Sequence, residues 1–451
     1  MQKTVLTQAV AVALATLGMG SAFAQSSLTL YGNADVSLDH VKGTKGVALA
    51  PALGAATVGL FNKGSVTRVS PSATSQTSYG IRGTEDMGGG FKASFVLEGQ
   101  LNHDTGALSQ DGRMFGRQSY VGLTTPFGEI RLGRQYAPIF YSTAVITGER
   151  FGATDLFIEG GATNNLMVRQ DNQISYWLKA GGLTASVAYS PNAGSYKTVN
   201  PQRAINNANA TTGGILGQAN AGNESAESEV GRSMGLFANY AVSDALNFSF
   251  GYHQNEFDGA RFGSAISAGS TTIPVVATVL LDQYQAVNLG VKYVIPGNNI
   301  MLSATAGQGE YGFTNAGTSD LELQFMALGV RVPVNAWTFS AQASQIKFKN
   351  FTKGKDTGLM LGTEYALSKR TSLFARWVQL KDDEGTASND AGFVRLDPQT
   401  GNVTGSLGGI VGGPTVVATA LGFRETPVFA GAGLNPGGKT TYIGAGIRHS
   451  F

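Results

Sequence analysis

Residues 433–440 read GLNPGGKT and match the pattern G-x-x-x-x-G-K-[ST], which is typical of a phosphate-binding loop. Such a loop binds phosphate because it follows a buried strand and opens a helix, whose first N–H groups point at the ligand. Here the chain runs on into a segment of alternating apolar and polar residues and then ends. The surroundings therefore contradict nucleotide binding, and we interpret 433–440 as the end of a long loop.

Histidine and aspartate also invite a catalytic or metal-binding interpretation. Two Asp-His neighbours occur, Asp39-His40 and His103-Asp104, but no nucleophile elbow accompanies them. None of the four histidines has the spacing of a metal motif: His40, His103, His253 and His449. The sequence therefore predicts no metal, no cofactor and no enzymatic activity, with a hydrolase kept as a remote alternative.

The last residues, Thr441–Phe451, alternate strictly between two kinds of side chain. One face carries Ile443, Ala445, Ile447, His449 and Phe451, and the other carries Tyr442, Gly444, Gly446, Arg448 and Ser450. Nine to eleven tilted residues are about what a strand needs to cross a bilayer. Leu28–Leu38 shows the same alternation, so the two ends of the chain each predict a strand between lipid and water.

Composition and the first residues narrow the class of protein. The chain has 451 residues, 62 glycines and no cysteine, so disulfides and thiolate metal sites are excluded. Residues 1–24 carry Lys3, an apolar stretch and the small-x-small end Ala22-Phe23-Ala24, which predicts a signal peptide before a mature chain of 25–451. Without Lys3 the 32 basic residues become 31 against 30 acidic ones, and this balance argues against nucleic acid as a partner.

Connections between the predicted strands alternate between short and long. Short turns rich in Gly, Pro, Asn, Asp or Ser are expected at 125–128, 179–182, 241–245, 295–298, 333–336 and 366–371. Long loops are expected at 136–170, 191–230, 255–281 and 381–439. About sixteen strands with short turns at one end predict a closed antiparallel transmembrane β-barrel. A β-sandwich would need a second sheet to cover each apolar face, so we prefer the barrel.

Several segments resemble Gram-negative general diffusion porins of the sixteen-stranded, trimeric type found in β-proteobacteria. They are SLTLYGNADVSL, GIRGTEDMGGGFKASFVLEG, GRQSYVGLTTPFGEIRLGRQY, YALSKRTSLFARW and the terminal GIRHSF. The resemblance implies a homotrimer in the outer membrane, in contact with lipid and lipopolysaccharide, that passes small hydrophilic solutes and ions. It also implies that the barrel-assembly machinery reads the strand ending at Phe451 as an insertion signal.

In this family the third loop folds into the lumen and faces basic residues on the wall. By resemblance, the constriction loop is 136–170 with acids Glu149, Asp155 and Glu159, and the basic residues are Arg82, Arg117 and Arg169, followed by Lys92 and Arg131. Period two by itself supports Lys92 and Arg131 as lumenal. By the same parity Arg117 points outward with Val121 and Leu123, so only the resemblance places it in the lumen.

The expected pore is wide and weakly selective, with a slight preference for anions. The family often has an arginine four positions before Arg82, and here that position is Ser78, which leaves one charge fewer. A substrate-specific channel is the alternative, because an aromatic track in the lumen would suit sugars. The lumen-facing Tyr31 and Tyr442 are too few for such a track.

Overall fold

The computed structural model describes residues 26–44, 65–71, 74–75, 77–108, 113–147, 169–191, 232–262, 265–268, 271–274, 279–313, 320–350, 354–382, 394–396, 403–406 and 439–451. The expected signal peptide 1–24 and most of the expected long loops lie outside these residues. Among the described residues no helix is long and apolar enough to cross a membrane.

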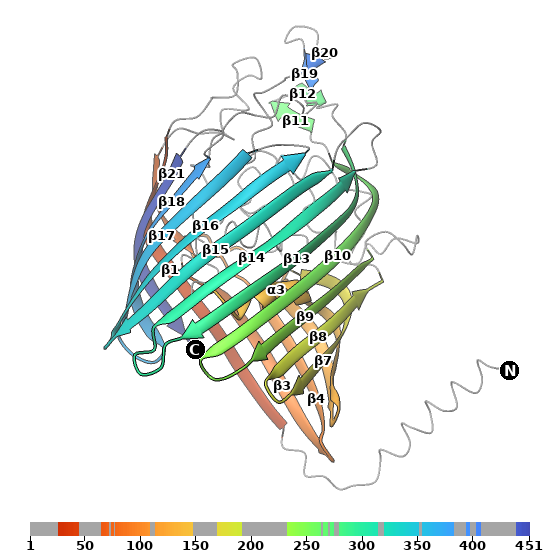
Figure 1. Ribbon diagram of the computed structural model, residues 1–451, viewed down its shortest axis with the longest axis vertical. Coiled ribbons are helices and arrows are strands. Elements are labelled where there is room, and N and C mark those ends of the chain that lie inside the picture. The colour runs from red at the N-terminus through yellow and green to blue at the C-terminus, as the bar shows by residue number, and fades with distance from the viewer. Residues whose placement is uncertain are drawn as a thin grey trace, which may run out of the picture.

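Strands make up nearly all of the described chain, and seventeen of them form one large antiparallel sheet (Figure 1). Its first members are β1 (Ser26–Thr44), β2 (Ser65–Pro71) and β3 (Ser78–Gly88). The strands that follow are β4 (Phe91–Gly99), β5 (Gln118–Thr125), β6 (Gly128–Tyr136), β7 (Arg169–Ala180), β8 (Leu183–Ser190), β9 (Ser233–Ala241), β10 (Leu246–Phe262), β13 (Val279–Val294), β14 (Met301–Phe313), β15 (Leu321–Val334), β16 (Trp337–Asn350), β17 (Gly354–Ala366), β18 (Thr371–Asp382) and β21 (Lys439–Ser450).

The sheet closes on itself through its first and last strands. β1 pairs along one side with β21, from Asn33↔Ser450 to Thr44↔Lys439. On its other side β1 pairs with β3 through Ser26–Asn33 and with β2 through Val36–Lys42. β2 and β3 are therefore two pieces of one barrel strand, and the seventeen segments of the sheet make sixteen strands around the barrel, as the alternation predicted.

The distribution of side chains is inverted relative to a soluble protein. On β1 the outward residues Leu28, Leu30 and Leu38 are 74%, 66% and 63% exposed, whereas the inward Asp35 and Asp39 are 0% and 2% exposed. Outward apolar residues continue on every later region of the barrel, for example Leu289 on β13 and Leu361 on β17. Strands alternate their side chains between two faces, so a lipid-facing exterior and a polar interior follow from the sequence pattern.

The connections confirm the expected polarity of the barrel. Two-residue turns join β5 to β6, β7 to β8 and β15 to β16, all at one end. The small hairpins β11 (Ala265–Ala268) with β12 (Thr271–Pro274), and β19 (Val394–Leu396) with β20 (Val403–Ser406), lie beyond the opposite end (Figure 1). Short turns at one end and long connections at the other are typical of outer-membrane barrels.

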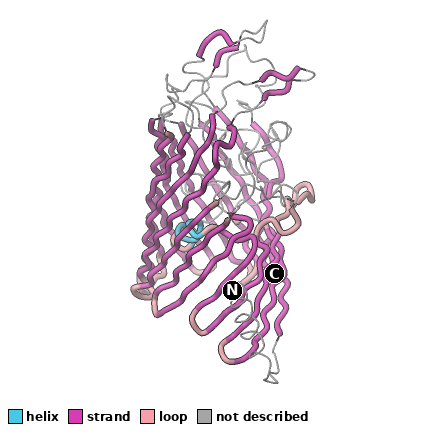
Figure 2. The backbone as a smooth tube through the Cα atoms, turned by 90° about the vertical axis from the view of Figure 1, so that its right-hand side faces the viewer, coloured by secondary structure: helices cyan, strands magenta, loops and turns pink. Residues whose placement is uncertain are grey.

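Among the described residues, one short helix, α3 (Pro138–Ala144), lies inside the barrel (Figures 1 and 2). It begins two residues after β6 ends, with proline at its first position, and nearly all of its residues are buried. It contacts β9, β10 and β13, which are separated from β6 in the sheet by β7 and β8. The start of the loop expected at 136–170 therefore folds into the lumen.

Candidate functional site: the lumenal wall and the inner helix

Arg82 lies on the lumenal face of β3, opposite Thr29 of β1. Its guanidinium carbon is 5.0 Å from the centre of the Tyr31 ring, a cation–π contact. The Tyr31 hydroxyl in turn donates a hydrogen bond of 2.9 Å to Glu98 on β4. Within the described chain Arg82 forms no ion pair, and the residue is exposed. Its positive charge therefore faces the water of the lumen.

Arg117 and Arg169 converge on a single tyrosine. Arg117 donates from Nε to Glu98 over 2.5 Å and from Nη2 to the Tyr136 hydroxyl over 2.6 Å. Arg169 donates to the same hydroxyl over 3.0 Å, and its guanidinium carbon lies 4.5 Å from the centre of the Tyr136 ring. Both arginines are more than nine-tenths buried. The strands β4, β6 and β7 and the segment before β5 thus bring two guanidiniums to one phenol.

The parity argument for Arg117 does not apply in the structure. β5 begins at Gln118, which pairs with the lumenal Glu98, while Val121 faces outward and is 62% exposed. Arg117 precedes the strand, so alternation along β5 does not determine its direction. Its side chain lies among Glu98 and Tyr136, on the inner side of the wall.

Arg131 and Lys92 are both held by carboxylates. Arg131 donates to Glu129 over 2.8 Å and lies between the Tyr120 ring, at 5.2 Å, and the Trp177 ring, at 4.7 Å. Lys92 lies beside the β3–β4 turn, where its ammonium is 3.4 Å from Asp86. Lys92 is thus at the short-turn end of the barrel, away from α3.

The inner helix is fixed to β10 and β13 by hydrogen bonds and close packing. Ser142 donates to Asn288 of β13, Ser249 of β10 donates to the Ser142 carbonyl over 2.6 Å, and Lys292 donates to the Val145 carbonyl over 3.0 Å. At Gly290 an added Cβ would lie 2.7 Å from Ile146, so glycine permits this close approach.

Aromatic rings of β6 and β7 also hold the helix. Phe140 stacks on Tyr136 with ring centres 4.3 Å apart, and Tyr141 meets Trp177 edge to face at 4.9 Å. Burial raises the pKa of the Tyr141 phenol, which therefore stays protonated and uncharged. Besides Tyr31 and Tyr442, the aromatic residues Tyr120, Tyr136 and Trp177 line the interior.

Positive charge exceeds negative charge on this wall. Among the described lumenal residues of β3–β7 near the helix, four arginines face two carboxylates: Arg82, Arg117, Arg131 and Arg169 against Glu98 and Glu129. The expected loop acids Glu149, Asp155 and Glu159 lie outside the described residues. The described part of the wall is therefore electropositive.

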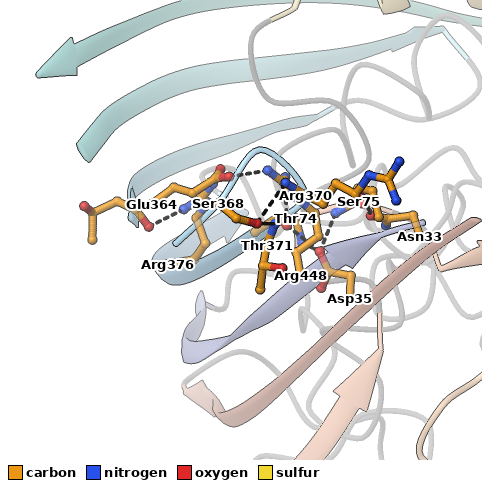
Figure 3. Close-up of polar contacts among 12 residues, drawn as sticks. Asn33, Asp35, Thr74, Ser75, Glu364, Ser368, Arg370, Thr371, Arg376 and Arg448 are labelled. Carbon is orange, nitrogen blue, oxygen red and sulfur yellow. Dashed lines mark hydrogen bonds and ion pairs between the residues drawn. The ribbon is translucent and has the colours of Figure 1, made fainter. Parts of the chain in front are cut away.

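A second polar network lies at the seam where β1 meets β21 (Figure 3). The buried Asp35 carboxylate accepts hydrogen bonds from the backbone N–H of Thr74, at 3.0 Å, and of Ser75, at 2.8 Å. Arg448 of β21 forms an ion pair with Glu364 of β17 and also contacts Thr74. Thr74, between β2 and β3, is thus tied to both strands of the seam.

Sequence reasoning did not single out the arginines of this second region. Arg376 on β18 and Arg68 on β2 face inward, and Arg68 lies 3.4 Å from the Asp39 carboxylate. The alternation of side chains along the strands could have identified them, since it places Arg448 on the water-facing side of the last strand. Which of these residues approach one another depended on the pairing of distant strands.

Asp39 and His40, one of the two Asp-His pairs, point to opposite faces of β1. Asp39 points into the barrel toward Arg68, whereas His40 contacts Thr67 on the other face of β1, because neighbours on a strand point in opposite directions. Lys439 and Thr440, the last residues of the phosphate-loop pattern, begin β21 and no helix follows them. The described residues contain no group of acids and histidines that could hold a metal ion.

Comparisons with known proteins agree with this architecture. The family model described as Gram-negative porin matches residues 9–386. Outer membrane porin protein 32 of Delftia acidovorans is 36% identical over 188 residues, which cover 40% of this chain and 48% of that relative. An outer membrane porin protein of Bordetella pertussis is 28% identical over 389 residues, covering 83% of this chain and 93% of the relative.

Solved structures share the fold. The anion-selective porin from Comamonas acidovorans superimposes with a TM-score of 0.59 at 23% identity, over 95% of this chain and 100% of that chain. The outer membrane protein OmpT of Vibrio cholerae, in its trimer form, gives a TM-score of 0.52 at 12% identity, over 94% of this chain and 99% of that chain.

Proposed function

Because the chain belongs to the Gram-negative porin family, we propose that it forms a water-filled channel through which small hydrophilic solutes and ions diffuse passively across the outer membrane. One observation carries the proposal. The barrel is closed, apolar outside and polar inside, and α3 crosses part of its interior. A closed barrel satisfies every backbone hydrogen bond in lipid, and its polar interior admits water.

The channel selects weakly by charge and prefers anions. Four arginines against two carboxylates on the described wall support this preference, since fixed charges in a narrow pore with low-dielectric walls attract counter-ions. We include Glu149, Asp155 and Glu159 of the 136–170 loop as the opposing acids, which keep the preference slight. The name of the Comamonas structure, an anion-selective porin, points in the same direction.

A potassium chloride gradient across a planar bilayer tests both statements. We expect stepwise conductance on adding the purified protein, and a reversal potential with the sign of a small chloride preference. A clearly cation-selective potential would overturn the preference. Absence of any conductance from folded, inserted protein would overturn the channel.

We further propose that the protein is a homotrimer embedded among lipid and lipopolysaccharide. Export would use residues 1–24 as a cleaved signal peptide. The barrel-assembly machinery would recognise the strand ending at Phe451 as the signal for insertion into the outer membrane. Conductance steps in groups of three and a heat-sensitive oligomer on a detergent gel are expected. A native N-terminus other than Gln25 would contradict the cleavage site.

A substrate-specific channel is the second candidate, because aromatic side chains other than Tyr31 and Tyr442 also line the lumen. Tyr136, Tyr141 and Trp177 pack against one another, against α3 or against arginines, rather than forming a free strip along the pore. We therefore favour general diffusion. Flux measurements with sugars of equal size decide the question, since saturable flux of one sugar would favour the specific channel.

We propose no enzymatic activity, with an outer-membrane hydrolase as the remote alternative. The opposite directions of Asp39 and His40 support this, because an acid–base pair must share a face. Hydrolysis of lipid or peptide by the purified protein would contradict it.

A further inference from the structure

Tyr136 lies where the lumenal arginines meet the inner helix. Its hydroxyl accepts a hydrogen bond from Arg117 and another from Arg169, and its ring stacks on Phe140 of α3. We propose that Tyr136 is a positioning residue that sets the ion selectivity of the pore, by holding these two guanidiniums against the wall through its hydroxyl. This inference rests on the proposed function, a weakly anion-selective channel.

The chemistry of the contact explains why the hydroxyl matters. A phenol oxygen has two lone pairs, so the Arg117 and Arg169 donors occupy both of its acceptor positions. A guanidinium stays charged at any ordinary pH, so two positive charges are brought to one oxygen. Glu98 binds Arg117 over 2.5 Å and offsets one of the two charges. The arrangement holds the two guanidinium groups against the wall. Without it, the two side chains would extend into the water of the lumen.

Burial of the two arginines supports this interpretation. Arg117 is 7% and Arg169 is 8% exposed, whereas Arg82, whose contact is with a ring face alone, is exposed. Electrostatic attraction of a passing anion is strongest when the cation borders the water-filled path. If the hydroxyl is removed, the freed N–H groups must find new acceptors, and water in the lumen supplies them. The arginines would then act more strongly on passing ions.

The ring and the hydroxyl of Tyr136 have separable roles. The ring supports α3 through a stacked contact with Phe140, at an interplanar angle of 10°. The other side of the helix is held independently, by Asn288 of β13 and Ser249 of β10. Replacing tyrosine with phenylalanine therefore removes the acceptor and keeps the stack, so α3 should stay in place.

The test is a set of reversal potentials in a potassium chloride gradient. We expect Tyr136→Phe to raise the chloride-over-potassium permeability ratio about twofold, the size expected of a charge at an exposed site, with single-channel conductance nearly unchanged. Tyr189→Phe removes a hydroxyl from an outward-facing side chain and serves as the matched control. An unchanged or lowered ratio in open Tyr136→Phe channels would overturn the inference.

A second variant, Arg169→Gln, tests the same mechanism with and without the Tyr136 hydroxyl. Arg169→Gln should lower the ratio less when Tyr136 is present than in the Tyr136→Phe background, where it should cancel the gain. A loss of anion preference from Arg169→Gln that is equally large in both backgrounds would show that the hydroxyl does not restrain this charge. Silent wild-type protein would overturn the proposed function together with this inference, whereas conducting wild-type channels with an unresponsive Tyr136→Phe variant would overturn the inference alone.

Discussion

Arg82 is the residue whose charge is most open to the pore among the four arginines of the described β3–β7 wall. The other three contact a carboxylate or are buried against Tyr136, whereas Arg82 lies over the Tyr31 ring and is exposed. We expect Arg82→Gln to lower the chloride-over-potassium permeability ratio about twofold. A solvent-exposed charge interacts with another charge by a fraction of a kcal/mol to about one kcal/mol, and a twofold change lies within this range. Reversal potentials in a salt gradient measure it.

Arg82→Lys is the matched control, because lysine keeps the positive charge at the same position. Its permeability ratio should stay close to that of the wild type. Raising the ionic strength should shrink the difference between Arg82→Gln and the wild type, since exposed charges are screened by salt. Equal ratios for glutamine and lysine variants at low salt would contradict the assignment.

Residue positions on regular strands could be predicted, but their partners could not. Alternation placed Arg131 in the lumen, and the structure adds Glu129 and Trp177 beside it. Alternation gave the wrong direction for Arg117 because the strand begins one residue later. The meeting of Arg117 and Arg169 on Tyr136 depends on the register of β4 to β7, which no short stretch of sequence encodes.

Elements of the barrel follow the alternation because lipid and water face the two sides of every strand. Leu361 of β17 lies near the middle of its strand, opposite Ala341 and Trp377 of the neighbouring strands, and is 50% exposed on the lipid side. We expect Leu361→Arg to lower the free energy of unfolding by about 2–4 kcal/mol, because a charge at the bilayer midplane loses its hydration. Urea unfolding in lipid vesicles measures it.

Val334→Arg is the control for depth on the same face. Val334 ends β15 at the two-residue turn and is 47% exposed, nearly as exposed as Leu361. Near the interface the same substitution should cost only about 0–1 kcal/mol, since the guanidinium reaches water. Equal losses at the two positions would mean that depth in lipid does not govern the effect.

Interruptions of the regular pattern escaped prediction for physical reasons. β2 and β3 form one barrel strand broken near Thr74 and Ser75, whose N–H groups bond to Asp35 instead of to a neighbouring backbone. α3 is only seven residues long, too short for helical periodicity to be recognised. Its stability comes from the neighbouring Tyr136 and from contacts with Asn288 and Ser249, which are distant in sequence.

The whole molecule depends on the seam between the first and last strands. Phe451 donates its N–H to the Gly32 carbonyl over 3.1 Å, and Gly32 returns a bond of the same length to Phe451. The pairing of β1 with β21 removes the last free edge, which would otherwise expose unpaired backbone groups to lipid. The contact of Arg448 with Thr74 crosses the same seam on the inner side, and Asp35 of β1 also binds Thr74 (Figure 3).

A cysteine pair tests this closure directly, because the chain contains no cysteine of its own. Leu38 on β1 and Ala445 on β21 face each other on the outer surface, within the roughly 4.4–6.8 Å between Cα atoms that a disulfide requires. We expect the Leu38→Cys and Ala445→Cys protein to form an internal disulfide on mild oxidation, which changes its mobility on a non-reducing gel after heating. Ala375 of β18 pairs with Ala445 and so lies two strand spacings from Leu38, roughly 9.6 Å away. Leu38→Cys with Ala375→Cys should therefore stay reduced, and cross-linking of this pair in preference to the first would mean that β21 does not occupy the seam.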